Sequence, residues 1–553
     1  MTGSPKQWFA LLFLFAAVAY GSASDIYFAQ SAQGSGTGAS CANAYAYNDP
    51  SNGINTSGMW VAGNTLHICG TITAPAGTNI VSAKSSGSSS NPITVKFEPN
   101  AVLQEQYFGT GGSAGIYLSG ANYVTVDGGG SGLIQATSNG TAGTNACPAG
   151  ACTRQVGNST VIEAMGVSNI TIRGLRCDNV YVQTARDSVG NTGISCIHFQ
   201  GSNVSIHDNT LANAGEGIDN TEYRADSNTQ IYNNDFHEDG WGIGCAGGAV
   251  NNSNYQIYNN HFHDFDRWTN GGGATHVNGI HCFDLSGGGI SSMYLYNNLF
   301  DGKMGNCCWT AWVYLEANGP GNNWNGSSGT LYAFNNVFVA GATCCNNGNG
   351  LLNYGGPSAT GHMVVNNYFY GTQAQAGPCI DFTGSGPGQT IMNNVFQNCG
   401  QVAAGSTFQG NPAPGWKTWD YNIYANISSG NSAWSVNSIN TNSFSTWQSQ
   451  CKCDAHSQAQ MSSLLADITS EGVPSAGYVG IQQGANLMSI ATGNLSALAY
   501  DTTAGNTRAA AARPSGSCST QGASSCWDIA AYQYGAGGNT APAAPTGLAA
   551  VAN

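Results

Sequence analysis

The stretch "IYNNDF", residues 231–236, recurs along the chain with its Asn-Asn pair or a close equivalent. The other copies are "IHDNTL" (206–211), "IYNNHF" (257–262), "LYNNLF" (295–300), "AFNNVF" (333–338), "VVNNYF" (364–369) and "IMNNVF" (391–396). The second turn residue is always Asn, and it falls at positions 209, 234, 260, 298, 336, 367 and 394. A unit that returns at this interval is the sequence signature of a stacked repeat architecture.

Each repeat has room for two or three short strands and their turns, and no helical apolar period occurs between the Asn pairs. Stacked coils of this kind pair each strand with its equivalents in the neighbouring coils, about 4.8 Å away. We therefore predict a β-solenoid. An Asn at the same corner of every coil can satisfy buried turn backbone and bond to the next Asn, so the Asn pairs are interpreted as structural.

Further segments carry a family resemblance. The stretches "GNTLHICGTIT" (63–73), "NPITVKFEPNAVL" (91–103) and "YVTVDG" (123–128) resemble the opening coils of alginate-lyase-like members of the pectin-lyase-like superfamily. The stretch "CWDIAAYQYG" (526–535) is similar to the closing segment of many secreted β-helix proteins. The resemblance implies an all-β, right-handed parallel β-helix as a single elongated domain over residues 25–536. It leaves the reaction open, because the superfamily contains lyases, hydrolases, esterases and adhesins.

The two ends of the chain differ from the repeats. Lys6, an apolar run over residues 8–19 and the small residues "YGSAS" predict a signal peptide over residues 1–24. Residues 537–553 are interpreted as a Pro/Ala linker that resembles the start of a fibronectin type III module. We therefore expect a secreted protein, extracellular or at the cell surface, and a monomer.

The 18 cysteines fit an oxidising compartment. Local disulfide bonds are predicted for Cys147 with Cys152, Cys379 with Cys399, and Cys518 with Cys526. Cys451 and Cys453 are separated by one residue, and the adjacent cysteines at 307–308 and 344–345 also lack the usual zinc-site spacing, which disfavours a structural zinc site.

The composition restricts the class of partner. The chain has 14 Lys and Arg against 28 Asp and Glu, a net charge of −14. Such a surface offers no electrostatic footprint for nucleic acid or an anionic membrane. The 41% hydrophobic and 10% aromatic content predicts a large core in spite of the low charge. An extracellular polysaccharide is the partner that we expect.

A second landmark in each coil is a strand led by an apolar residue, and insertions concentrate at the corner before it. The landmark residues are Ile218, Ile243, Ile280, Val313, Leu351 and Ile380. If this row faces inward, the next residue of each strand faces outward. The outward row then runs through Ser195, Asp219, Gly244, His281, Tyr314, Leu352 and Asp381. The inward Cys196, Cys245 and Cys282 are interpreted as core residues or as one bridge between coils.

The outward row and its loops suggest a groove. Asp219 and His281 would lie two coils apart, roughly 10 Å, with Gly244 leaving space for a sugar ring. Glycoside hydrolysis needs two carboxyl groups beside the scissile bond. The candidates are Asp219, Asp239 and Glu316. Trp241 would stack against the sugar, and His276 and Asn278 would contribute binding groups.

Polysaccharide β-elimination is the alternative reaction. It needs a base, an acid and a cation that neutralises the uronate carboxylate. His281 with Tyr314, together with Arg224 or Arg267, could supply these groups. Alginate-lyase-like proteins use a Lys and Arg pair, but the predicted groove strands contain no Lys. Bound Ca²⁺ would be a substitute cation.

A metal site is a third interpretation. His237 and His263 occupy one outward row of consecutive coils, with His261, Glu238 and Asp264 nearby. Two imidazoles one strand apart can share a divalent cation, so His237, His263 and Asp264 are the predicted ligands. The alternative is that stacked His and Asp side chains only pair with one another across the coils.

The sequence therefore predicts a secreted polysaccharide-degrading enzyme whose groove is centred on residues 216–316. Hydrolysis is preferred over elimination because carboxylates outnumber cations there. A non-catalytic glycan-binding or adhesive protein is the alternative outside the enzymes.

Overall fold

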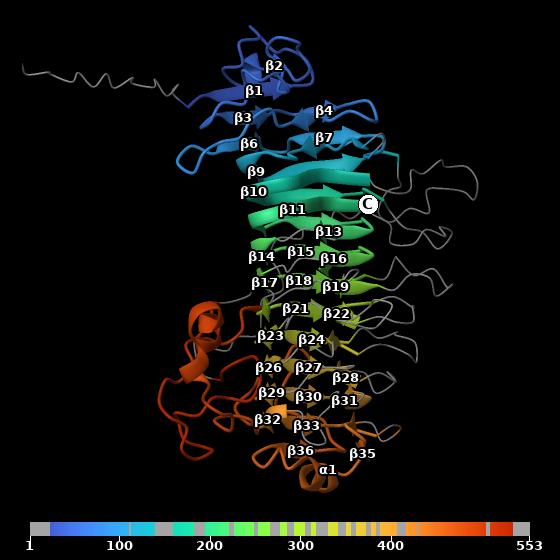
Figure 1. Cartoon of the computed structure of the whole chain (residues 1–553), viewed down its shortest axis with the longest axis vertical. Coiled ribbons are helices and arrows are strands. Elements are labelled where there is room, and N and C mark those ends of the chain that lie inside the picture. The colour runs from blue at the N-terminus through green and yellow to red at the C-terminus, as the bar shows by residue number, and fades with distance from the viewer. Residues whose placement is uncertain are drawn as a thin grey trace, which may run out of the picture.

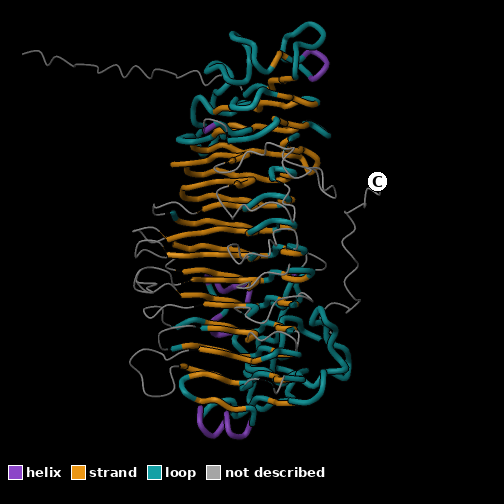
Figure 2. The backbone as a smooth tube through the Cα atoms, turned by 90° about the vertical axis from the view of Figure 1, so that its right-hand side faces the viewer, coloured by secondary structure: helices purple, strands orange, loops and turns teal. Residues whose placement is uncertain are grey.

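The computed structural model is an elongated stack of coils built from short parallel strands (Figure 1). Turned by 90°, the strands form columns that run nearly the full length of the molecule (Figure 2). The structure describes residues 23–109, 112–138, 159–181, 194–220, 226–247, 253–265, 277–284, 292–304, 311–316, 330–340, 350–354, 361–371, 378–382, 388–405, 416–427, 430, 432–504 and 509–534. The predicted all-β parallel β-helix is confirmed.

Each coil contributes to three columns of strands, which we call the first, second and third sheets. The first sheet precedes the Asn turn. It contains β1 (Asp25–Ala29), β3 (Thr65–Ile68), β6 (Ile93–Phe97), β9 (Asn122–Ala136), β10 (Ser159–Asp178), β11 (Ile194–His207), β14 (Ser227–Tyr232), β17 (Ser253–Tyr258), β20 (Ser292–Tyr296), β23 (Thr330–Phe334), β26 (Met363–Val365), β29 (Gln389–Met392) and β32 (Trp416–Asp420).

The second sheet follows the Asn turn. It contains β4 (Thr71–Thr73), β7 (Val102–Glu105), β12 (Thr210–Ala212), β15 (Asp235–His237), β18 (His261–His263), β21 (Leu299–Asp301), β24 (Val337–Val339), β27 (Tyr368–Tyr370), β30 (Val395–Gln397), β33 (Ile423–Ala425) and β36 (Gln458–Gln460). The long strands β9 and β10 also continue into this sheet.

The third sheet carries the landmark residues. It contains β5 (Val81–Ser82), β8 (Ile116–Tyr117), β13 (Glu216–Asn220), β16 (Trp241–Gly247), β19 (Asn278–Asp284), β22 (Ala311–Glu316), β25 (Leu352–Tyr354), β28 (Pro378–Asp381), β31 (Gln401–Gly405) and β34 (Trp434–Val436). The first halves of β10 and β11 belong to it as well.

The Asn turns form the predicted ladder. In each rung the Asn side-chain oxygen accepts the backbone N–H of the preceding Asn, as Asn260 Oδ1 does from Asn234 at 3.0 Å. Its Nδ2 donates to a strand carbonyl, as Asn260 does to Ile231 at 2.9 Å. The ladder runs through Asn209, Asn234, Asn260, Asn298, Asn336, Asn367, Asn394 and Asn422. These buried amides satisfy turn backbone that water does not reach.

The first residue of each turn explains the other half of the Asn-Asn pattern. Asn233, Asn259 and Asn297 have φ values of 54°, 55° and 55°. Among residues with a side chain, Asn adopts this left-handed conformation most readily. Directly after the turn, Phe236, Phe262, Phe300, Phe338, Phe369 and Phe396 stack inside the coils with ring centroids 4.7–5.1 Å apart.

The coils end in two closing structures. Beyond β34, the antiparallel β35 (Ile439–Thr441) and helix α1 (Phe444–Cys451) lie at the end of the stack, where Trp447 is fully buried. Residues 461–504 and 509–534 then run back outside the coils, beside the first sheet (Figure 1). Asn393 Oδ1, for example, accepts the backbone N–H of Ala485 at 2.8 Å.

Disulfide bonds connect cysteines of neighbouring coils and turns. The predicted pairs Cys379–Cys399 and Cys518–Cys526 are confirmed, and the expected bridge between adjacent coils is Cys245–Cys282. The further pairs are Cys41–Cys69, Cys177–Cys196 and Cys451–Cys453. Cys196 is thus bonded to Cys177 rather than being a plain core residue.

Some expectations concern residues outside the described ranges. They are the signal peptide up to residue 22, the Cys147–Cys152 pair and the fibronectin-like tail at 537–553. In the ranges that the structure describes, no helix is long and apolar enough to cross a lipid bilayer.

Candidate functional site

The strand register of the third sheet decides which side chains meet. Asp219 pairs with Gly244, Gly244 with His281 and His281 with Tyr314, as predicted. The row differs from the prediction at both ends. His198, rather than Ser195, pairs with Asp219, and Asn353, rather than Leu352, pairs with Tyr314. Leu352 and not Leu351 continues the apolar landmark row, because one more residue precedes the strand than the sequence pattern suggested.

Gly244 does not leave open space in this row, which corrects the expectation of a gap for a sugar ring. A Cβ atom at Gly244 would collide with Oε2 of Glu216 and would lie 3.2 Å from the ring of Trp241. A side chain at this position would displace the Glu216 carboxyl group, which approaches Gly244 from the preceding coil. The indole of Trp241 lies beside it in the same strand as Gly244.

Glu216 is the functional candidate that the sequence analysis missed. It has the same parity as the inward Ile218, so alternation places its side chain in the core. The register between β11 and β13 is continuous, from Ser195–Glu216 to Ile197–Ile218, and Glu216 is buried as alternation predicts, but its carboxyl group reaches the outer row at Gly244. The one sequence signal was a glutamate directly before a glycine at a corner.

Glu216 and Asp219 form a desolvated acidic pair. Their exposed fractions are 3% and 6%. Burial, and after it the charge of Asp219, raises the pKa of Glu216 well above that of an ordinary glutamate. Such surroundings favour the protonated form of a carboxyl group. Oε2 of Glu216 has no hydrogen-bond partner among the described residues. The pair therefore combines a potential proton donor with a second carboxyl group.

Beyond Gly244 the row continues with His281 and Tyr314, and Trp241 lies beside it. The ring of His281 meets the ring of Trp241 edge to face at 4.3 Å and stacks on Tyr314 at 5.2 Å. His281 is 3% exposed, whereas Tyr314 is half-buried. The structure thus brings together four predicted site residues, Asp219, Trp241, His281 and Tyr314.

On the other side of Asp219 the row continues with an ion pair that the sequence analysis did not anticipate. His198 Nδ1 lies 2.9 Å from Oε2 of Glu163. Both side chains are half-buried and lie on neighbouring strands of the same face. The erroneous register that started the row at Ser195 concealed this pair.

Two of the predicted site residues are buried and form hydrogen bonds to backbone groups. Asp239 is fully buried at the corner before β16, where its Oδ1 accepts the backbone N–H of Ala214 at 2.9 Å. Asn278 is also fully buried, and its Nδ2 donates to the carbonyl of Ala311 at 2.8 Å. Both side chains bond to backbone of a neighbouring coil. Oδ2 of Asp239 has no hydrogen-bond partner among the described residues, and burial raises the pKa of Asp239 well above its ordinary value.

For other predicted site residues, the structure does not describe the side chain. Arg224, Arg267 and His276 fall in ranges that the structure does not describe. Glu316 lies in β22 and its backbone pairs with Phe283, but its side chain is outside the description. Lys303 lies in the bend after β21, where its backbone N–H donates to Oδ1 of Asp264.

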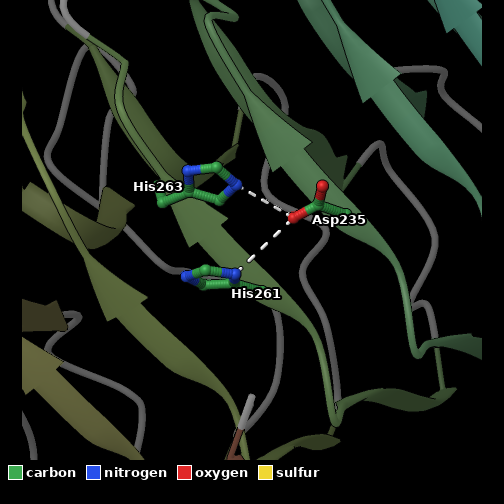
Figure 3. Close-up of side chains that lie close together, drawn as sticks. All are labelled: Asp235, His261 and His263. Carbon is green, nitrogen blue, oxygen red and sulfur yellow. Dashed lines mark hydrogen bonds and ion pairs between the residues drawn. The ribbon is translucent and has the colours of Figure 1, made fainter. Parts of the chain in front are cut away.

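A second cluster lies on the neighbouring second sheet (Figure 3). The side-chain ligand atoms of Asp235, His261 and His263 all lie within 4.8 Å of one another. Burial lowers the pKa of His263, but its ion pairs with Asp235 and Asp264 outweigh that effect and raise the pKa to about 9. Burial raises the pKa of Asp235, and the hydrogen bond from His263 outweighs it, so this pKa is lowered.

The predicted metal ligands meet only in part. His237 pairs with His263, as expected, and their rings stack at 5.2 Å. Asp264 Oδ2 lies 3.1 Å from Nδ1 of His263, on the side of the ring away from Asp235. The group that converges is Asp235, His261 and His263, so the sequence analysis missed Asp235 and gave His261 only a supporting place.

Comparisons with known proteins add little to this site. No protein-family model matches the chain, and no curated protein matches it. Among solved structures, one described as the complex structure of XylC with xylose aligns with a TM-score of 0.37 and 13% identity, covering 73% of this chain and 84% of that chain. A similarity of this size does not bear on the activity.

Proposed function

We propose that this protein is a secreted enzyme that cleaves glycosidic bonds of an extracellular polysaccharide by hydrolysis, at the third sheet around Glu216 and Asp219. The observation that carries the proposal is the Glu216–Asp219 pair, in which burial and the neighbouring charge raise the pKa of Glu216. Acid–base glycoside cleavage requires two carboxyl groups in different protonation states.

In this mechanism Glu216 protonates the glycosidic oxygen of the leaving group. Asp219 is the carboxylate that activates the attacking water and stabilises positive charge at the anomeric carbon. Removal of the pair from bulk water favours the protonated form of Glu216 and strengthens the interaction of Asp219 with a cationic transition state. Tyr314, the more exposed aromatic residue of the row, is the proposed contact for a sugar ring.

Elimination is favoured by one observation, the stacked His281–Tyr314 pair, because a histidine base beside a tyrosine acid suits proton removal next to a uronate carboxylate. It is the second candidate. That reaction also needs a cation, for which Arg224, Arg267 or bound Ca²⁺ is the candidate, whereas hydrolysis does not.

Incubation of the full-length protein with a panel of neutral and uronate-containing glycans separates these reactions. Hydrolysis gives new reducing ends without the ultraviolet absorbance of an unsaturated uronate. Asp219→Asn and Glu216→Gln, which preserve side-chain shape, are each expected to lower kcat by about 100-fold or more. His281→Ala should also lower turnover, but with a loss of stability, because His281 packs between Trp241 and Tyr314.

Asp381→Asn is the matched control. Asp381 belongs to the same strand row, with Asn353 between it and Tyr314, and should leave kcat unchanged. New reducing ends together with the unsaturated uronate product would show that the enzyme acts by elimination and not by hydrolysis. Binding of a glycan without any cleavage would identify an adhesive protein, and full activity of both carboxyl variants would show that the site lies elsewhere.

A further inference from the structure

The second sheet carries a cluster that the proposed hydrolysis does not use. Phe236 and Phe262 point into the core, so the residues that flank them in β15 and β18 point outward. In the parallel register Asp235 lies opposite His261, and His237 lies opposite His263. The next strand, β21, places Asp301 opposite His263. Three imidazoles and two carboxylates therefore share one outer face across three consecutive coils.

Each imidazole directs one nitrogen toward the same carboxylate oxygen (Figure 3). His263 Nε2 lies 3.0 Å from Oδ1 of Asp235, and His261 Nδ1 lies 3.6 Å from that oxygen. Ligands bonded to Zn²⁺ at about 2.0–2.1 Å in a tetrahedral site are about 3.3 Å from one another. The two spacings lie on either side of that value, and all three ligand atoms lie within 4.8 Å of one another, so side-chain shifts can bring them around one ion.

The remaining nitrogen of each imidazole meets a different carboxylate. His261 Nε2 lies 2.8 Å from Oδ1 of Asp301, and His263 Nδ1 lies 3.1 Å from Oδ2 of Asp264. This is the second-sphere arrangement of metal-bound histidines, in which the N–H donates to a carboxylate and fixes the ring orientation and tautomer. His67 also contacts two carboxylates, Asp25 and Glu98, so two contacts on one ring are not sufficient. What distinguishes this cluster is that the inner contacts of two rings converge on one oxygen.

From this geometry we infer that Asp235, His261 and His263 form a binding site for a divalent transition-metal ion of the Zn²⁺ class, with Asp301 and Asp264 as the carboxylates that orient the two imidazoles. Two nitrogen ligands and one oxygen ligand favour Zn²⁺ over Ca²⁺ and Mg²⁺, which take oxygen ligands.

The half-buried side chains leave the ion accessible from solvent. The exposed fractions of the Asp235, His261 and His263 side chains are 26%, 22% and 16%. Three protein ligands leave a fourth position for water. The site lies on the second sheet, whereas Glu216 and Asp219 lie on the third, so its role in metal binding does not depend on the proposed hydrolysis.

The test uses the full-length protein after removal of metal with a chelator. Titration with Zn²⁺ is followed by calorimetry, and the bound metal is counted by elemental analysis. We expect about one ion per chain with an affinity in the micromolar range or tighter. His263→Ala should weaken binding by at least 100-fold. Asp301→Asn, which retains shape and all direct ligands, should weaken it by about 10–100-fold.

His456→Ala is the matched control, because His456 pairs with a single carboxylate, Asp420, at 2.7 Å. It should bind Zn²⁺ as the unaltered protein does. Co²⁺ provides a second readout, since a tetrahedral site gives visible absorption that should be lost in His263→Ala. Failure of the stripped protein to bind Zn²⁺ or Co²⁺, or equal binding by His263→Ala, would overturn the site and leave the cluster as an ion-pair network.

Discussion

Glu216 illustrates how one residue can acquire a functional property from its position at a corner. Its carboxyl group extends over Gly244 and next to Asp219, where it is almost fully buried. The pKa of Glu216 is raised because the charged form loses hydration and faces the charge of Asp219. The same environment that prepares a proton donor also destabilises the fold at high pH.

Replacement of this group should therefore change the pH dependence of stability. The folded protein retains the Glu216 proton at pH values where the unfolded chain, with a glutamate pKa of about 4.3, has already lost it. Stability then falls as pH rises above that value toward the raised folded pKa. Glu216→Gln should remove this fall and raise the Tm at neutral and mildly alkaline pH, measured by thermal melts across a pH series, while it abolishes glycan cleavage.

Glu105 is the matched control for this prediction. It is a fully buried carboxyl group of β7, far along the stack, whose pKa burial raises to about 8. Glu105→Gln should also increase stability above the ordinary glutamate pKa but should leave glycan cleavage unchanged. An unchanged pH dependence of Tm in Glu216→Gln would contradict the proposed protonation of the site.

At the scale of elements, the Asn ladder joins the strands into one stack. Asn298 shows the pattern. Its Oδ1 accepts both the backbone N–H and the Nδ2 of Asn260, at 3.0 and 3.1 Å. Its Nδ2 donates to the carbonyl of Ile257 and to Asn336. All of these groups are buried, so each rung satisfies the turn of another coil.

Asn298→Ala should remove this rung and leave buried donors and a carbonyl without partners. Each unsatisfied group costs about 1–3 kcal/mol, so we expect a loss of about 3 kcal/mol. Hydrogen exchange of the backbone amides in residues 257–260 and 295–300 measures the local opening free energy. The matched control is Asn228→Gly, which removes an exposed Asn contact at a turn with φ of 56° and should change stability by less than about 0.5 kcal/mol. Equal effects of the two variants would rule out burial as the reason for the ladder's strength.

At the scale of the whole molecule, a buried cation is one of the groups that hold residues 461–504 and 509–534 against the outside of the coils. Arg513 is 3% exposed and donates to the carbonyls of Tyr500, Ala530 and Ala531 at 3.1, 3.2 and 2.8 Å. It also reaches Oδ1 of Asn335 in the turn of a coil, 3.3 Å away. The guanidinium is thus one of several contacts that join the returning segment to the stack, another being Asn393 with Ala485.

Arg513→Met should weaken this attachment, because several buried carbonyls lose their donor. We expect faster hydrogen exchange and faster proteolysis within residues 484–504 and 509–534, with little change in β14, β17 and β20. Arg173→Met is the matched control, since Arg173 is 47% exposed and pairs with Asp127 on the surface. Uniformly faster exchange along all coils would mean that the segment is needed for the whole fold.

The repeated Asn-Asn turn with its following Phe was sufficient to predict the parallel β-helix, because a coil places the same residue types in the same environment each time. Parity within a strand also predicted the neighbours Asp219, Gly244, His281 and Tyr314. It failed at corners, where the chain changes direction and alternation starts again, and there it misplaced Ser195 and Leu352 and concealed Glu216.

What the sequence by itself determined is therefore the architecture and the regular rows, since both follow from local alternation and a repeated turn. Only the tertiary structure decided that Glu216 fills the space at Gly244 and that Asp235 joins His261 and His263. The physical reason is that these contacts form between coils. The register at each corner, which no single coil specifies, determines which side chains share a face and how deeply they are buried.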